Sequence, residues 1–232
     1  MFRRINEDDL IRRLQRRIQQ EPRDFSPDDV EKALASMGVV EDDFRQRVTV
    51  LAEQLAAGRI TLEQWKRAMR DEIRRYHLTA AIIGAGGLAL AGAAALLIAR
   101  KRMVMQTKYF NAWAEQIERG VFPVDAAARL RQRAGLYAGA GQATFTESLF
   151  AAMGMPTLPA YPRDGQTDCR NNCLCHWQVT KLEGRGNWDC KWVLGAAEHC
   201  DQCPRRALVW NPLMIRNGVI QPYNRAGLFR LF

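Results

Sequence analysis

The chain has 232 residues, of which 47% are apolar, and it carries a formal net charge of +9. This length and apolar content exclude a peptide too small to bury a core of its own, and they suit one or two domains. The positive charge is uneven, because residues 169–232 carry nine Lys or Arg against four Asp or Glu, whereas residues 1–77 carry 16 against 15. A basic segment suits nucleic acid, an acidic protein surface or a membrane surface as a partner.

Residues 1–77 have the apolar spacing of amphipathic helices. The first predicted helix has an apolar stripe of Leu10, Ile11, Leu14 and Ile18. Ser26-Pro27-Asp28-Asp29 is typical of a helix start, because serine caps the first turn and proline is tolerated at the first helical position. We expect the helix that begins here to end near Gly38.

Two further helices are predicted before residue 77. One has an apolar stripe that ends at Gly58 and consists of Phe44, Val48, Leu51, Leu55 and Ala56. Thr61 and Gln64 have the spacing of a capping box, which begins a helix that carries Trp65, Met69 and Ile73. Stripes of this kind are typical of a buried helix face rather than of a binding surface.

Residues 78–99 form a run of 22 residues without a charged side chain, flanked by basic residues at both ends. This length is enough to cross a bilayer, which makes the run a membrane-spanning candidate. Four glycines and nine alanines make it only weakly hydrophobic, and the flanking charges favour neither orientation. We therefore expect a buried or interface segment, which residues 84–87, Gly-Ala-Gly-Gly, break into a helix, a turn and a second helix.

The helical pattern resumes at Arg100. One predicted helix extends to Gly120 with Tyr109, Phe110, Trp113 and Ile117 on one face. Another follows Pro123 and continues towards Phe150 with Ala127, Leu130, Ala134, Leu136 and Tyr137. Residues 154–168 contain three prolines and two glycines without periodicity, so we expect a linker between a helical domain, residues 1–153, and a C-terminal module, residues 169–232.

All six cysteines and two of the three histidines lie between Cys169 and Cys203. Cys200-x-x-Cys203 has the spacing of a knuckle, a tight turn that presents two thiolates to one tetrahedral Zn²⁺, and Cys169-x-x-x-Cys173 can supply the other pair. The sequence therefore predicts a zinc site with Cys169, Cys173, Cys200 and Cys203 as ligands.

Four other positions near this site need a separate interpretation. Cys175 and His199 are substitute ligands, because a strand places Cys175 on the same face as Cys173 and His199 adjoins the knuckle. Cys190 stands between two tryptophans and is predicted to be a buried thiol. His176 points to the opposite face of its strand and is predicted to be an exposed polar residue.

Apolar and polar residues alternate on both sides of the turn sequence at residues 184–186, Gly-Arg-Gly. The apolar positions are Cys173, Cys175, Trp177 and Val179 before the turn, and Trp188, Cys190, Trp192 and Leu194 after it. This pattern predicts a β-hairpin with one aromatic face, and a hairpin closed by a cysteine knuckle is zinc-ribbon-like. The expected fold is thus mainly α, a multi-helix N-terminal array followed by a small cysteine-rich hairpin module whose tail breaks into short irregular or strand pieces.

Two other states of the cysteines remain open, namely three disulfides or mostly unliganded thiols. Residues 1–4, Met-Phe-Arg-Arg, lead into charged residues rather than an apolar stretch, so the sequence does not indicate an oxidising compartment. No phosphate-binding glycine loop, nucleophile elbow or His-Glu-x-x-His motif occurs, and the sequence indicates no catalytic site. Residues 198–200, Glu-His-Cys, are better explained as part of the knuckle than as a reactive dyad.

The motifs of the C-terminal region resemble one family. Asp164-Gly165-Gln166-Thr167 leads into residues 169–177, and Trp192, Glu198-His199-Cys200, Cys203 and Trp210-Asn211-Pro212 follow. This pattern resembles the C-terminal region of tailed-phage minor head proteins, the head morphogenesis proteins related to Mu protein F. Residues 172–175, Asn-Cys-Leu-Cys, are similar to the Asn-Cys-Arg-Cys element of that group, although Leu174 replaces a basic residue and so argues against a phosphate contact there.

The resemblance covers roughly residues 60–212 and implies a structural protein without enzymatic activity. It implies a virion location, in the head interior or at the portal vertex, with time in the host cytoplasm during assembly, and a role in head assembly or in DNA packaging and delivery. The implied partners are the portal protein and other head or neck proteins, and an oligomeric ring is compatible with such a role.

DNA is a further candidate partner, bound without sequence preference. On charge alone the residues for phosphate contact are Arg170, Lys181, Arg185, Lys191, Arg205 and Arg206. Two other functions remain open: a membrane-associated protein with a cytosolic zinc module, and a zinc-dependent nucleic-acid-binding protein.

Overall fold

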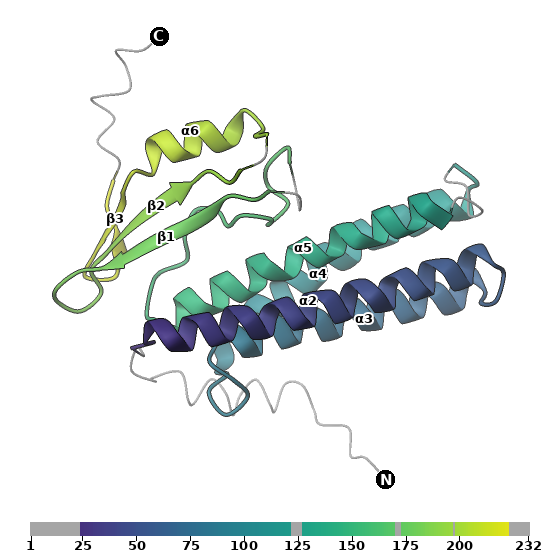
Figure 1. Cartoon of the computed structure of the whole chain (residues 1–232), viewed down its shortest axis with the longest axis horizontal. Coiled ribbons are helices and arrows are strands. Elements are labelled where there is room, and N and C mark those ends of the chain that lie inside the picture. Colours follow the sequence, from purple (N-terminus) through teal and green to yellow (C-terminus); the bar gives the residue numbers. More distant parts are fainter. Residues whose placement is uncertain (1–23, 122–126, 170–172, 197, 223–232) are drawn as a thin grey trace. The chain divides into compact units, whose positions relative to one another are not determined.

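The computed structural model describes residues 24–121, 127–169, 173–196 and 198–222. The chain divides into two compact units, Met1–Met153 and Gly154–Phe232. In the described residues the first unit has four long helices, and the second has a four-stranded antiparallel sheet and one short helix (Figure 1). The expectation of a mainly helical chain with a small β module at its C-terminal end is confirmed.

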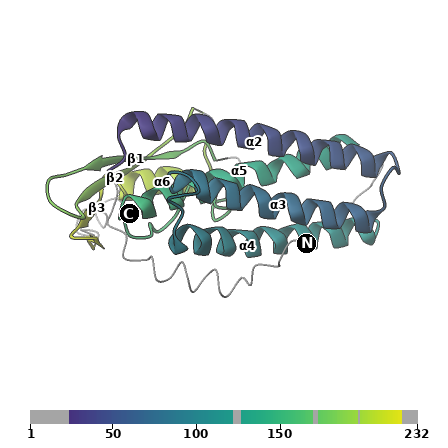
Figure 2. The ribbon, with the colours of Figure 1, turned by 90° about the horizontal axis from the view of Figure 1, so that it is seen from below.

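The helices of the first unit are α2 (Pro27–Ala56), α3 (Leu62–Gly84), α4 (Ala93–Glu118) and α5 (Ala127–Ala152). Their axes run side by side in both views of the ribbon (Figures 1 and 2). Helices α3 and α5 each pack against all three other helices of this unit. The unit is therefore a bundle in which α3 and α5 supply most of the shared core.

Two helices begin at the predicted caps. The Ser26 hydroxyl accepts a hydrogen bond from the Asp29 backbone N–H, and the Asp29 carboxylate accepts one from the Ser26 N–H. Thr61 and Gln64 form the same reciprocal pair at the start of α3. These bonds satisfy backbone donors that the first helical turn leaves without partners, which fixes both starting points.

The prediction of a helix end near Gly38 is wrong. Helix α2 continues through this residue to Ala56, just before Gly58, which has a positive φ of 65°. The buried side chains on both sides of Gly38 belong to one stripe, formed by Met37, Phe44, Val48, Ala52 and Leu55. A glycine inside a helix costs only about 1 kcal/mol relative to alanine, which the burial of this stripe outweighs.

Aromatic rings from three helices fill one part of the bundle core. The ring of Trp65 on α3 lies 5.1 Å from Phe110 and 5.0 Å from Trp113, both on α4, and Tyr137 of α5 stacks on Trp113. These were the residues predicted to share the apolar faces. Tyr109, which was predicted for the same face, is 47% exposed. Its side chain points about 100° away from that of the next residue, Phe110, which is buried.

The small-residue run at residues 78–99 is divided as predicted. Helix α3 ends at Gly84, Gly86 and Gly87 have positive φ values of 90° and 107°, and α4 begins at Ala93. One buried cluster joins the two helices and consists of Ala81, Ala85, Ala95 and Ala99. Within the residues that the structure describes, no helix combines the length and apolarity needed to span a membrane.

Buried polar side chains follow or precede the alanines of this cluster along the same helices. Arg102 of α4 forms an ion pair with Glu147 of α5, and both side chains are 3% exposed. His77 of α3 lies 2.7 Å from the Thr144 hydroxyl. Burial, and then the nearby Arg102 guanidinium, lower the pKa of His77 to about 3, so this imidazole is neutral in the folded bundle near neutral pH.

The second unit contains β1 (His176–Lys181), β2 (Trp188–Val193), β3 (Leu213–Arg216) and β4 (Val219–Ile220), which lie in this order in the sheet. The predicted hairpin of β1 and β2 is confirmed, and its turn uses positive φ values at Gly184 and Gly186. Its inward positions, Trp177, Trp188, Cys190 and Trp192, are buried. Leu194, predicted for the same face, follows the end of β2 and is exposed.

Three elements of this unit were not predicted individually. Helix α6 (Gln202–Val209) follows the knuckle directly, and β3 and β4 form a second hairpin. Asn217 and Gly218 form the turn of that hairpin with positive φ values of 52° and 76°. Asn-Gly is the strongest short signal for such a turn, so this hairpin could have been predicted from the sequence.

Replacement of Gly84 by alanine tests the close packing of the small-residue segment. An added Cβ at Gly84 would overlap the backbone oxygen of Phe145 on α5, and a backbone atom cannot move aside cheaply. We expect Gly84→Ala to lower the free energy of unfolding by about 1–3 kcal/mol, measured by chemical denaturation with helical circular dichroism. Gly38→Ala is the matched control, because no atom lies within 4 Å of its Cβ position, and it should raise stability by about 0.5–1 kcal/mol. An equal gain in both variants would contradict the close contact of α3 with α5.

Candidate metal centre

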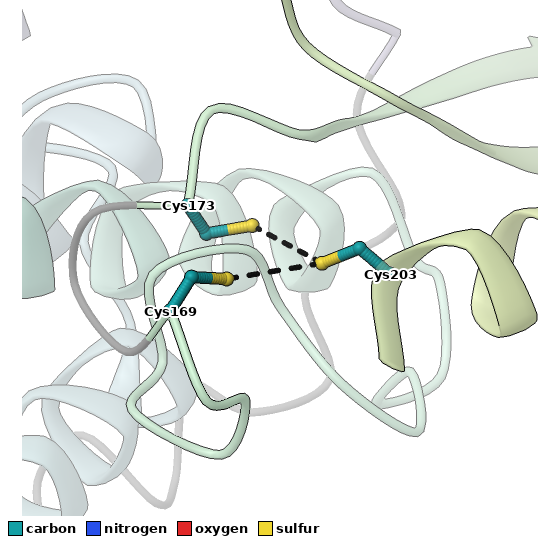
Figure 3. A group of neighbouring side chains, drawn as sticks. All are labelled: Cys169, Cys173 and Cys203. Carbon is teal, nitrogen blue, oxygen red and sulfur yellow. Dashed lines mark hydrogen bonds between the residues drawn. The ribbon is translucent and has the colours of Figure 1, made fainter. Parts of the chain in front are cut away.

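Two segments of the second unit bring five thiols together. Residues 169–175 precede β1, and residues 199–203 lead into α6. Cys169, Cys173 and Cys203 have sulfur atoms that all lie within 4.8 Å of one another, and this group could hold a metal ion. Figure 3 shows the Cys169 and Cys173 side chains next to each other, with both sulfurs directed at the Cys203 sulfur at the start of α6.

The sulfur separations fit a tetrahedral metal site. The Cys203 sulfur lies 3.9 Å from that of Cys169 and 3.7 Å from that of Cys173 (Figure 3). Four thiolates at a Zn–S distance of about 2.3 Å are about 3.8 Å apart along each edge of a tetrahedron. The thiols thus already have the spacing that such an ion requires.

Cys200 extends the cluster on its more exposed side. Its sulfur lies 3.4 Å from that of Cys169 and 3.7 Å from that of Cys203, and the Cys203 N–H donates to the Cys200 carbonyl to close the knuckle. Burial is the largest influence on the pKa of Cys200 and raises it, but hydrogen bonds from Cys169 and Cys203 bring the pKa down to about 7. The structure therefore brings three of the four predicted ligands, Cys169, Cys173 and Cys203, within 4.8 Å of one another, and it places Cys200 beside Cys169 and Cys203.

The two most buried of these thiols resist ionisation without a metal. Burial, as the largest cause, raises the pKa of Cys173 to about 12. Burial and the neighbouring Cys173 thiol also raise the pKa of Cys203 far above its ordinary range. Because a metal binds thiolates, metal binding at neutral pH must release the protons of these two groups.

Cys175 and His199, the predicted substitutes, adjoin the cluster. The Cys175 sulfur lies 3.8 Å from Nδ1 of His199, and the Cys175 thiol is a neighbour that raises the pKa of both Cys173 and Cys203. Cys175 is buried, whereas His199 is half-buried. Six side chains with ligand atoms therefore occupy one small region.

Cys190 and His176 have the surroundings that the sequence predicts. Cys190 is fully buried in β2, opposite Val179 of β1 and Leu213 of β3, and burial raises its pKa to about 12. His176 is exposed. Neither belongs to the thiol cluster, which leaves Cys190 as an internal control for experiments on the other cysteines.

All six cysteines are free thiols in the structure. The shortest sulfur separation given above, 3.4 Å between Cys169 and Cys200, exceeds a disulfide bond length of about 2.05 Å by a wide margin. Of the three states considered from the sequence, the geometry therefore agrees with unbonded thiols that are arranged closely enough to bind an ion.

An aromatic cluster lies beside the helix that carries Cys203. The rings of Trp177, Trp192 and Trp210 have centroids 5.2 to 5.6 Å apart. The Arg206 guanidinium of α6 lies 5.3 Å from the Trp192 ring and 5.5 Å from the Trp210 ring. Since α6 carries both Cys203 and Arg206, a fixed Cys203 also fixes the helix that covers the tryptophans.

The six basic residues predicted for DNA contact have different surroundings. Lys181, Arg185, Lys191 and Arg205 are exposed, and Arg170 lies outside the described residues. Arg206 packs on two tryptophan rings, and its buried Nη1 has no hydrogen-bond partner among the described residues. Its guanidinium supports the fold of the module, which leaves four described candidates for phosphate contact.

Comparisons of the chain with protein-family models, with curated proteins and with solved structures found no match. The side chains and their geometry therefore carry the functional argument.

Substitution of Cys203 tests the metal centre. We expect the reduced, purified protein to contain about one zinc per chain and Cys203→Ser to contain none, because Cys203 contacts three other thiols of the cluster. Structural zinc contributes on the order of 10 kcal/mol, so the tryptophans of this unit should become exposed while helical circular dichroism persists. The measurements are metal analysis and tryptophan fluorescence. Cys190→Ser should keep the zinc and lose only about 1–3 kcal/mol for the buried hydroxyl, and loss of metal from both variants alike would refute this ligand assignment.

Proposed function

We propose that the chain is a structural, non-enzymatic minor head protein of a tailed phage, whose C-terminal module is held together by Zn²⁺. In this role it docks at the portal vertex and assists head assembly or DNA packaging and delivery. The observation that carries the proposal is the thiol cluster, because its members are the residues in which the sequence resembles the head morphogenesis proteins.

The residues of the resemblance belong to two clusters within one module. Cys169, Cys173, Cys200 and Cys203 make the thiol cluster, and Trp177, Trp192 and Trp210 make the aromatic one. A chance match of scattered residues would have no reason to produce two compact groups joined by one helix. This arrangement supports the view that the resemblance reflects a shared module.

Zinc is the metal that the donor set favours. Thiolates are soft ligands that select zinc, copper(I) or iron–sulfur clusters over magnesium and calcium. The Cys200-x-x-Cys203 knuckle and the sulfur separations of 3.4–3.9 Å suit a closed tetrahedral site. A closed site of this kind has a structural rather than a catalytic role, which agrees with a protein that is not an enzyme.

The helical unit supplies the surface for docking in this proposal. Its long helices carry exposed large apolar side chains, among them Leu34, Val39 and Val50 on α2 and Leu97 and Val104 on α4. Helical partners bind each other through apolar side chains that repeat along a helix face. The portal and other head or neck proteins are the proposed partners, and copies arranged in a ring agree with this role.

Co-expression with the portal protein of the same genome tests the proposal. We expect the two proteins to elute together from a size-exclusion column, and we expect portal and terminase genes next to the gene for this chain. A portal protein from an unrelated phage is the control and should elute separately. The proposal fails if the gene neighbourhood lacks head genes and the two proteins do not associate. Recovery of the chain with membranes would instead support the membrane-associated alternative.

DNA binding in this proposal is weak and independent of sequence. If Lys181, Arg185, Lys191 and Arg205 each neutralise one phosphate, the slope of log affinity against log salt is about −3.6 on duplex DNA. Lys191→Ala with Arg205→Ala should reduce the slope by about 1.8, measured by filter binding of the full chain. Arg59→Ala with Arg119→Ala removes the same charge from exposed positions of the helical unit and should leave the slope unchanged. Retention that prefers one sequence and ignores salt would support the nucleic-acid-binding alternative instead.

A further inference from the structure

The segment that leads into the first cysteine is packed against the sheet of the second unit. Residues 154–168 were predicted as a linker from their prolines and glycines, and they belong to this compact unit. The Trp177 indole N–H of β1 donates a hydrogen bond of 2.9 Å to the Ala160 carbonyl, which attaches the segment to the sheet. Its buried side chains include Leu158, Tyr161, Asp164 and Thr167.

Asp164 folds this segment into a turn. It is 1% exposed, and its carboxylate accepts hydrogen bonds of 2.9 Å from the backbone N–H groups of Tyr161 and Gln166. A buried carboxylate needs donors of this kind. Gly165 follows with a positive φ of 81°, which glycine adopts without strain. The motif at residues 164–167, Asp-Gly-Gln-Thr, therefore has a defined backbone that carries Thr167 towards the thiol cluster.

Two side chains of the segment contact residues of the cluster. The Thr167 hydroxyl lies 3.3 Å from the Cys169 sulfur, and Thr167 is only 4% exposed. Nε of Arg163 donates a hydrogen bond of 2.9 Å to the Cys173 backbone carbonyl. Arg163 also has a positive φ of 65°, which is unfavourable for a residue other than glycine. Backbone strain of this kind persists where surrounding contacts require it, as at binding sites.

The chemistry of a metal-bound thiolate gives the Thr167 contact a direction. A thiolate has no proton to donate, so the Thr167 hydroxyl must donate to the Cys169 sulfur once a metal is bound. Hydrogen bonds of this kind orient the ligand atoms, and their loss typically costs about 10–100-fold in metal affinity. Cys169 is only half-buried, so the bond also withdraws charge from a thiolate that dissolved reagents can reach.

We propose that Thr167 and Arg163 orient two of the zinc ligands without binding the ion themselves. Thr167 donates a hydrogen bond to the Cys169 thiolate, Arg163 holds the backbone of Cys173, and Asp164 folds the segment that carries both. This inference rests on the zinc site of the proposed function and does not depend on the phage role. It also gives a role to the Asp-Gly-Gln-Thr motif, which precedes the cysteines but contains no ligand.

The zinc affinity of the full chain, measured by competition with a chromophoric chelator, tests the Thr167 contact. Thr167→Val keeps the size of the side chain and removes the hydroxyl, so we expect the affinity to fall about 10–100-fold. Thr167→Ser keeps the hydroxyl and should bind nearly as tightly as the wild type. Thr180→Val is the matched control, because it makes the same change at an exposed position of β1, and its affinity should equal that of the wild type.

The spectrum of the Co²⁺-loaded chain separates the orientation of a ligand from a general loss of structure. A donated hydrogen bond stabilises the electrons of the sulfur, so its removal lowers the energy of sulfur-to-cobalt charge transfer. We expect this absorption band to move to longer wavelength in Thr167→Val and to stay unchanged in Thr167→Ser and Thr180→Val. A substitution that only weakened the fold would lower the bound fraction without moving the band.

Arg163→Met tests the second contact, because methionine fills a similar space without a donor. Its zinc affinity should fall about tenfold or more. Its Co²⁺ band should stay at the wild-type wavelength, since Arg163 contacts a carbonyl and not a sulfur. Arg185→Met is the matched control, because it removes an exposed arginine from the turn between β1 and β2, and it should bind zinc as the wild type does.

Three results would overturn the proposal. The first is an equal zinc affinity and an equal Co²⁺ spectrum in Thr167→Val and Thr180→Val. The second is an equal loss of affinity in Thr167→Ser and Thr167→Val, because the hydroxyl would then have no effect. The third is an affinity of Arg163→Met that matches that of Arg185→Met. A wild-type chain that binds no zinc would instead remove the metal site of the proposed function itself, a failure that appears before any variant is compared.

Discussion

The second unit depends on one constraint, the convergence of thiols on the buried Cys203. This sulfur contacts Cys169 and Cys173 from the segment before β1 and Cys200 from its own knuckle. Without an ion, the pKa of Cys173 and of Cys203 is raised mainly by burial, and both thiols stay protonated and crowded. In the proposed metal site, an ion would replace that crowding with four strong bonds, and metal binding and folding are linked in small modules of this type.

The same constraint extends to the aromatic cluster. Helix α6 contains Cys203 in its first turn and places Arg206 over Trp192 one turn later. Trp210 caps the end of this helix, and its carbonyl accepts a hydrogen bond from the Trp192 N–H. The thiol cluster, the helix and the tryptophans therefore form one connected structure. The described helices of the first unit are stabilised differently, by the burial of long apolar stripes and, at the starts of α2 and α3, by reciprocal caps.

The sequence predicts what is determined locally. The caps at Ser26 and Thr61, the turn at Gly184 and Gly186, and the cysteine spacing each depend on a few neighbouring residues. All of them agree with the structure.

Features that depend on packing between residues far apart in the sequence could not be predicted in this way. The continuity of α2 through Gly38 depends on a stripe that the rest of the bundle buries. The pairing of Arg102 with Glu147 joins residues 45 positions apart, and periodicity says only that each lies on a helix. Arg206 was predicted from its charge to contact phosphate, whereas its guanidinium lies over two tryptophan rings.

Burial also determines what the resemblance to phage head proteins can mean. Its most specific residues, such as Cys173, Trp192 and Cys203, are buried, so they determine how the module folds and cannot themselves contact a partner. Contact with a portal protein or with DNA must use exposed side chains such as Val39, Val104 or Lys191, which lie outside the motifs that carry the resemblance. The proposed metal site and the partner contacts of the proposed phage role therefore use different residues. A zinc-free protein would remove the metal site and weaken the support that the thiol cluster gives to the phage role, whereas a chain that does not bind portal proteins would remove the phage role and leave the metal site.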